Sequence, residues 1–105
     1  MKTPLTLALA TAATLTSLPA LADAGTALVA KHNCLACHDV DKKVVGPSYK
    51  DVSAKYRGNR AAAAKLMQKI RLGSSGEWGN VPMAANTAVP DTDAKLIADW
   101  ILNLR

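Results

Sequence analysis

Two cysteines three positions apart, followed at once by a histidine, constrain this chain of 105 residues more than any other feature. They lie in Cys34-Leu35-Ala36-Cys37-His38, and the sequence has no other cysteine. The pattern C-x-x-C-H is typical of covalent c-type haem attachment. Thiols at this spacing can add to the two vinyl groups on one porphyrin edge, and the next residue then places an imidazole beneath the iron. We therefore predict that Cys34 and Cys37 attach a haem and that His38 is an axial iron ligand.

Three other kinds of site use similar residues, and each lacks something here. A redox dithiol of the thioredoxin type needs a βαβ setting, and no alternating strand pattern is present. A structural zinc site needs a fourth ligand and usually a second cysteine pair. An isolated disulfide between Cys34 and Cys37 would close a very small loop and would leave His38 without a role. The motif favours haem over all three.

The first 22 residues differ from the rest of the chain. After a short positively charged start, residues 5–18 are uncharged and mostly apolar, and Ala20-Leu21-Ala22 has the small-x-small pattern of a cleavage site. A membrane-spanning helix needs about 20 apolar residues, and this run ends earlier, at Pro19. We predict a signal peptide over residues 1–22, cleaved after Ala22, and a periplasmic mature domain over residues 23–105 without stable membrane insertion.

The predicted mature domain has little large apolar material from which to build a core. It contains no Phe, two Trp and two Tyr, so a buried cofactor would supply what the side chains lack. Loss of Lys2 lowers the basic count from 13 to 12 against 8 acidic residues, a net charge of +4. This mildly basic surface suits transient docking on acidic protein patches, and no aromatic residues alternate with basic runs as in a nucleic-acid groove.

Apolar spacing and capping residues predict an all-α fold of about four short helices around one haem. The first helix is expected over residues 24–33 and a short one over residues 48–56. The clearest begins at Asn59 as N-cap and ends at Gly73, and the last begins near Asp91 or Thr92. Between Gly73 and Pro90 the helical period is lost, which predicts a long, ordered, functional loop.

The second axial ligand decides between electron transfer and ligand chemistry. The mature chain offers three donors, His32, Met67 and Met83. His32 lies on the same side as the attachment point and is expected to be an exposed polar residue. Met67 lies in the apolar stripe of a helix and is expected to fill the core. Met83 lies in the long loop, outside any helical stripe, and is the favoured ligand.

These residues together resemble the small bacterial class I cytochromes c, specifically the cytochrome c-551/c-552 family. The resemblance covers the whole mature chain. It rests on the following segments: Cys34-Leu35-Ala36-Cys37-His38, Val45-Gly46-Pro47, Gly73-Ser74-Ser75-Gly76-Glu77-Trp78-Gly79, Val81-Pro82-Met83, Asn86 and Ala98-Asp99-Trp100-Ile101-Leu102.

The resemblance implies a role for several further residues. Met83 would be the axial sulfur ligand, the Pro47 carbonyl would accept a hydrogen bond from His38, and Asn86 would bond near the methionine sulfur. Trp78 would reach a haem propionate. A propionate could also be neutralised by a basic residue of the preceding helix, Lys69 or Arg71.

The sequence departs from the family pattern at two places. Where relatives often have two prolines after the ligand, this chain has Ala84-Ala85, which gives the unfolded loop more freedom. Pro90 stands where a serine N-cap is common.

The leading prediction is a non-enzymatic electron carrier with one covalent haem c, cycling between ferrous and ferric iron. It would work between respiratory-chain donors and terminal reductases or oxidases, as a monomer that binds redox partners transiently. Lysines 31, 42, 43, 50 and 55 are candidates for a docking rim. Two alternatives remain: a gas-binding or peroxidase-like haem protein with an open axial position, and the haem domain of an enzyme with a fixed partner subunit.

Overall fold

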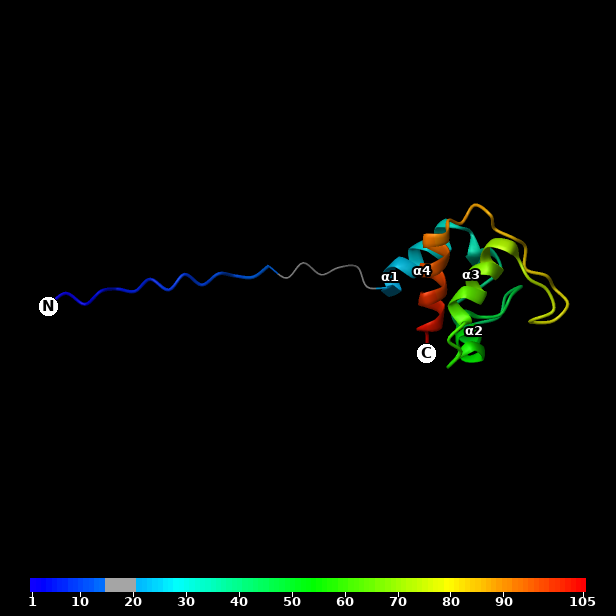
Figure 1. The fold of residues 1–105 in the computed structure, drawn as a ribbon, viewed down its shortest axis with the longest axis horizontal. Coiled ribbons are helices and arrows are strands. Elements are labelled where there is room, and N and C mark those ends of the chain that lie inside the picture. Colours follow the sequence, from blue (N-terminus) through cyan, green and yellow to red (C-terminus); the bar gives the residue numbers. More distant parts are fainter. Residues whose placement is uncertain (15–20) are drawn as a thin grey trace.

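The computed structural model describes residues 1–14 and 21–105. Its elements are, in chain order, α1 (Leu21–Lys31), the 3₁₀ turn η1 (Cys34–Ala36), α2 (Tyr49–Tyr56), α3 (Ala62–Leu72) and α4 (Asp91–Leu102) (Figure 1). The described residues contain no β-strand and only two isolated bridges, His38 with Lys43 and Ser74 with Met83. The predicted all-α fold is confirmed.

The N-terminal segment is described as far as residue 14. Residues 1–14 form no helix or strand and are exposed. Part of the predicted signal peptide, residues 15–20, lies outside the described residues, and the cleavage site after Ala22 stays a prediction. Among the described helices, none has the length and apolar character needed to cross a membrane.

The first helix runs from Leu21 to Lys31 and not over residues 24–33 as expected. Its C-terminal end is set by Asn33, whose φ of 61° lies in the left-handed region and cannot continue a helix. Asp23 lies in the first turn, where a negative charge is favoured by the helix dipole.

The caps of the two middle helices confirm the prediction for Gly73 and contradict the prediction for Asn59. Ser48 caps α2, because its hydroxyl accepts the Asp51 N–H at 3.1 Å. Asn59 is not the N-cap of α3, which is Ala61. The Asn59 side chain instead accepts the Ala61 N–H at 2.9 Å and forms a turn ahead of the helix. Gly73 ends α3 as predicted, with its N–H donating to the Lys69 carbonyl at 2.9 Å.

Helix α4 lies between α1 and α3 and also contacts α2, so it is the centre of the fold (Figure 1). It begins at Asp91, as expected, with Pro90 at the N-cap position and no side-chain cap. Its buried residues Ala94, Ile97 and Ala98 are at most 1 % exposed. The two alanines on this face let the neighbouring helices approach closely.

Candidate functional site

The attachment segment is a tight turn directly after α1. The backbone N–H groups of Cys37 and His38 both donate to the Cys34 carbonyl, at 3.2 and 3.0 Å. Cys34 is half-buried, Cys37 is exposed, and the two are not joined in a disulfide. Burial raises the pKa of the Cys34 thiol, which is the opposite of what an activated redox dithiol requires. Among the described residues, no group of three or more His, Cys, Asp or Glu could hold a metal ion, so a zinc site gains no support.

The His38 ring is held in one orientation from two sides. Its Nδ1 lies 2.8 Å from the Pro47 carbonyl oxygen, as the resemblance implied. A carbonyl only accepts, so Nδ1 carries the hydrogen and Nε2 presents its lone pair. The ring also packs against Gly46, where an added Cβ would lie 2.5 Å from His38 Cε1. His38 is therefore oriented as a metal-ligating imidazole.

Tyr49 is a site residue that was not predicted from the sequence. Its ring stacks on His38 at 5.1 Å between centroids and meets Trp100 edge-on at 5.3 Å. The residue is 3 % exposed, and its hydroxyl has no hydrogen-bond partner among the described residues. Burial raises the pKa of this phenol, so it stays a neutral donor. A buried hydroxyl without a partner indicates that a further group belongs next to it.

All seven site residues predicted from the sequence line one cavity. Its volume is about 530 Å³, within the usual range for small-molecule and cofactor sites. The predicted residues in its wall are Cys34, Cys37, His38, Pro47, Trp78, Met83 and Asn86. Met67 does not line this cavity and packs against the hydrophobic core, as expected.

Met83 is held by its backbone to the start of its own segment, which runs between α3 and α4 and which we call the Met83 loop (residues 73–90). Its N–H donates to the Ser74 carbonyl at 2.8 Å, and its carbonyl accepts the Ser74 N–H at 3.1 Å. Gly73 makes this approach possible, because an added Cβ would lie 2.6 Å from the Met83 carbonyl oxygen. The half-buried thioether is thereby carried to the cavity by a fixed piece of backbone.

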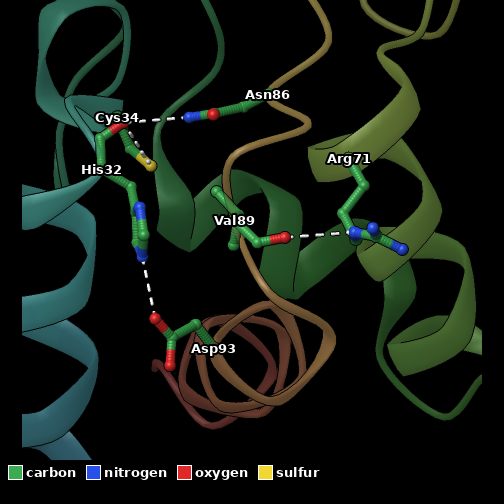
Figure 2. A network of polar contacts seen from close by, with 6 residues as sticks. All are labelled: His32, Cys34, Arg71, Asn86, Val89 and Asp93. Atoms are coloured by element: carbon green, nitrogen blue, oxygen red, sulfur yellow. Dashed lines mark hydrogen bonds and ion pairs between the residues drawn. The ribbon is translucent and has the colours of Figure 1, made fainter.

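His32 is not the exposed polar residue that was expected. Its side chain is only 10 % exposed, and Nε2 lies 2.9 Å from a carboxylate oxygen of Asp93, in the first turn of α4 (Figure 2). Its carbonyl accepts the Asn86 side-chain amide at 3.1 Å. The end of α1, the Met83 loop and the start of α4 therefore meet at His32. The predicted contact between Asn86 and the methionine sulfur stays a prediction.

The two basic residues proposed to face a propionate are committed to other partners. Arg71 bonds to the Asp91 carboxylate at 2.6 Å and does not line the cavity. It also donates to the Val89 carbonyl at 3.1 Å (Figure 2). Lys69 does line the cavity, but its ammonium lies 2.6 Å from a Glu77 carboxylate oxygen. Glu77 was not among the predicted site residues, because only the fold brings it to α3.

The donors gathered at this cavity fit a c-type haem. Two unpaired thiols, a fixed imidazole with a free nitrogen lone pair, a thioether and an orphaned buried hydroxyl line a single space of suitable size. Cys34, Cys37 and His38 would hold the porphyrin and its iron from the attachment turn, and Met83 would approach from the Met83 loop.

Comparison with known proteins agrees with this chemistry. The family model for cytochrome c matches residues 22–105. Cytochrome c-552 of Nitrosomonas europaea is 54% identical over 84 residues, which cover 80% of this chain and 82% of the relative. Cytochrome c-551 of Pseudomonas aeruginosa is 44% identical over 103 residues, 98% of each chain.

Solved structures give the same picture. The crystal structure of wild-type Nitrosomonas europaea cytochrome c552 aligns with a TM-score of 0.75 and 54% sequence identity, covering 76% of this chain and 99% of that one. Members of this family are electron carriers with one covalently attached haem c. From its C-x-x-C-H turn, the four α-helices of its described residues and these relatives, the chain belongs to the cytochrome c family and is a small class I cytochrome c of the c-551/c-552 type.

Proposed function

We propose that this haem-based electron carrier has His/Met axial ligation and works in the periplasm, passing single electrons between respiratory-chain donors and terminal reductases or oxidases. The observation that carries the proposal is that His38 and Met83 line one cavity and are each held by backbone contacts of their own segment. When bound, the haem supplies an iron centre that gains and loses one electron, at a potential that methionine ligation raises.

The residues of the chain would keep the two ligands in place in both oxidation states. Pro47 and Gly46 fix the His38 ring, and Tyr49 stacks on it. Ser74 pairs with Met83 through two backbone hydrogen bonds. A site that moves little on a change of charge has a low cost of reorganisation, which suits electron transfer and requires no bond-making chemistry.

Oxidised and reduced visible spectra of the purified holoprotein test the ligation. A far-red band of the ferric protein, diagnostic of iron–methionine bonding, is expected in the wild type and should be absent in Met83→Ala, while Met67→Ala retains it. Rapid carbon monoxide binding by the untreated ferrous wild type would contradict the proposal and support the alternative with an open axial position.

Export is proposed on the pattern of residues 1–22. It is supported by the family match, which begins at residue 22 and leaves residues 1–21 outside it. Mass spectrometry of the protein recovered from the periplasm should give the mass of residues 23–105 plus one haem. A mass that includes residues 1–22 would overturn the cleavage.

We also propose that the monomeric protein docks transiently on acidic patches of redox partners. Two lysines of the expected rim are engaged within the chain, Lys50 with Asp41 and Lys55 with Glu77. Lys31, Lys42 and Lys43 form no ion pair within the described residues. Rates of electron exchange with an acidic partner should fall as salt rises, and Lys42→Glu with Lys43→Glu should lower them, whereas Lys95→Glu on α4 should change them little.

A further inference from the structure

Glu77 lies in the Met83 loop and contacts two helices at once. One carboxylate oxygen lies 2.6 Å from Lys69 Nζ on α3, and the other accepts the Tyr56 hydroxyl of α2 at 3.0 Å. Lys55 Nζ donates to the Glu77 carbonyl at 3.1 Å and lies 3.5 Å from the carboxylate. We call these four residues, Lys55, Tyr56, Lys69 and Glu77, the Glu77 cluster.

The Glu77 cluster stands between two hollow regions of the protein. One is the haem cavity, and the other is a side cleft of about 440 Å³ between α2, α3 and the loop. Four residues line both, namely Tyr56, Lys69, Ser74 and Glu77. Three of the four belong to the cluster, so its contacts form the wall that separates the haem cavity from the side cleft.

The loop beyond this wall has few other attachments. Among the described residues, the hydrogen bonds from residues 75–82 to other elements all involve Glu77. Lys55 Nζ also lies 4.6 Å from the centroid of the neighbouring Trp78 ring. The stretch contains Gly76 and Gly79, both with positive φ and with open space around them, so its own backbone does little to stiffen it.

The carboxylate of Glu77 stays charged at neutral pH. The hydrogen bond from Lys69, followed by that from Tyr56, lowers its pKa to about 2. The Glu77 side chain is 37 % exposed and that of Lys69 is 20 % exposed. Because the pair is partly buried, solvent screens it less than a fully exposed ion pair. Its charges are also less desolvated than those of a buried ion pair.

We propose that Glu77 is a positioning residue that holds the Met83 loop closed over the haem cavity and thereby limits the access of outside ligands to the iron. The inference rests on the proposed His/Met ligation. It goes beyond that ligation, because it assigns the closure of the site to a carboxylate that touches neither haem ligand in the structure.

Closure of this kind is measurable because an outside ligand must displace Met83. The apparent affinity of the outside ligand for the iron equals the intrinsic affinity multiplied by the fraction of molecules in which the loop is open. Glu77→Gln keeps the size and one hydrogen-bond acceptor but removes the charge that Lys69 and Tyr56 bind. The open fraction, and with it the apparent affinity, should rise.

The experiment titrates the ferric holoprotein with imidazole and follows the visible spectrum. Glu77→Gln should raise the apparent association constant of imidazole about three- to tenfold, the range expected for losing one or two part-exposed charged contacts. Tyr56→Phe, which removes one bond of the same cluster, should raise it less. Asp99→Asn removes a remote exposed ion pair with Lys95 and should leave it unchanged.

General destabilisation is separated by a second control. Val29→Ala truncates a buried residue of α1 that lines neither cavity, so it should lower the free energy of unfolding without strengthening imidazole binding. If Glu77→Gln binds imidazole as the wild type does, or Val29→Ala gains as much, the inference is wrong and the ligation stands. If the ferric wild type lacks the iron–methionine band, the proposed ligation itself fails and the inference falls with it.

Discussion

The two sides of the haem cavity are built in different ways. On the His38 side, every contact that fixes the ligand comes from within Cys34–Tyr49, a single short stretch of chain. On the Met83 side, the pairing of Met83 with Ser74 lies within the Met83 loop, and the loop itself is held by other elements. The Ile70 carbonyl of α3 accepts the Asn86 N–H, and the Glu77 cluster connects the loop to α2 and α3. A local motif secures one ligand and the tertiary fold secures the other, so the two sides should respond differently to substitution.

The largest loss of stability is expected from Gly73→Ala, on the Met83 side of the cavity. Gly73 has φ 77° and ψ 177°, a region that is essentially restricted to glycine, and an added Cβ would lie 2.6 Å from the Met83 carbonyl oxygen. Strain and overlap together should lower the free energy of unfolding by about 2–4 kcal/mol. The far-red band should disappear on heating well before the helical circular dichroism does.

Gly58→Ala is the matched control for backbone strain. Gly58 has a φ of 80° but nothing within 4 Å of an added Cβ, so only about 1 kcal/mol is expected. Equal effects of the two substitutions would mean that the contact with Met83 contributes nothing.

The next largest loss of stability is expected from Gly46→Ala, on the His38 side of the cavity. The added Cβ would lie 2.5 Å from His38 Cε1, and the ring cannot retreat without leaving the Pro47 carbonyl or the Tyr49 stack. We expect a loss of about 1–3 kcal/mol in the free energy of unfolding and a shifted NMR signal of the His38 Nδ1 hydrogen. The nearby Val44→Ala, at a residue that is 46% exposed and does not line the haem cavity, should change neither.

The stability of the Met83 side should depend on pH through the carboxylate of Glu77. Its pKa is lowered from 4.5 to about 2 in the folded protein, because Lys69 and Tyr56 bond to the charged form. The contribution is therefore fully present above pH 4.5 and is lost as the pH falls through about 2. The wild type should exceed Glu77→Gln in free energy of unfolding at pH 6, with a difference that vanishes near pH 2; a constant difference would contradict the role of the charge.

The smallest change in stability is expected from introducing prolines after Met83. Neither Ala84 nor Ala85 donates a backbone hydrogen bond among the described residues, so Ala84→Pro and Ala85→Pro remove no contact. Each should raise the free energy of unfolding by about 0.4–1 kcal/mol by restricting the unfolded loop. The far-red band should persist to a higher temperature. Destabilisation would mean that the native backbone angles at these positions do not suit proline.

The same contrast explains which features could be predicted from the sequence. Cys34, Cys37 and His38 form a contiguous motif, and the helices carry local periodicity and caps, so both were accessible. Tyr49, Glu77 and the pairing of His32 with Asp93 were missed, because each depends on a partner brought close only by the tertiary fold. Asn59 was misplaced as an N-cap because asparagine forms turns ahead of a helix as readily as it caps one.

The central position of α4 has a consequence for when the core can fold. The helix that contacts α1, α2 and α3 is also the last described helix in chain order, ending at Leu102. An added Cβ at Gly25 would lie 2.0 Å from Trp100 Cγ, so even α1 is shaped to receive this final segment. The core cannot close before α4 is available. Until then Cys34 and Cys37 lie in a chain whose core is still open.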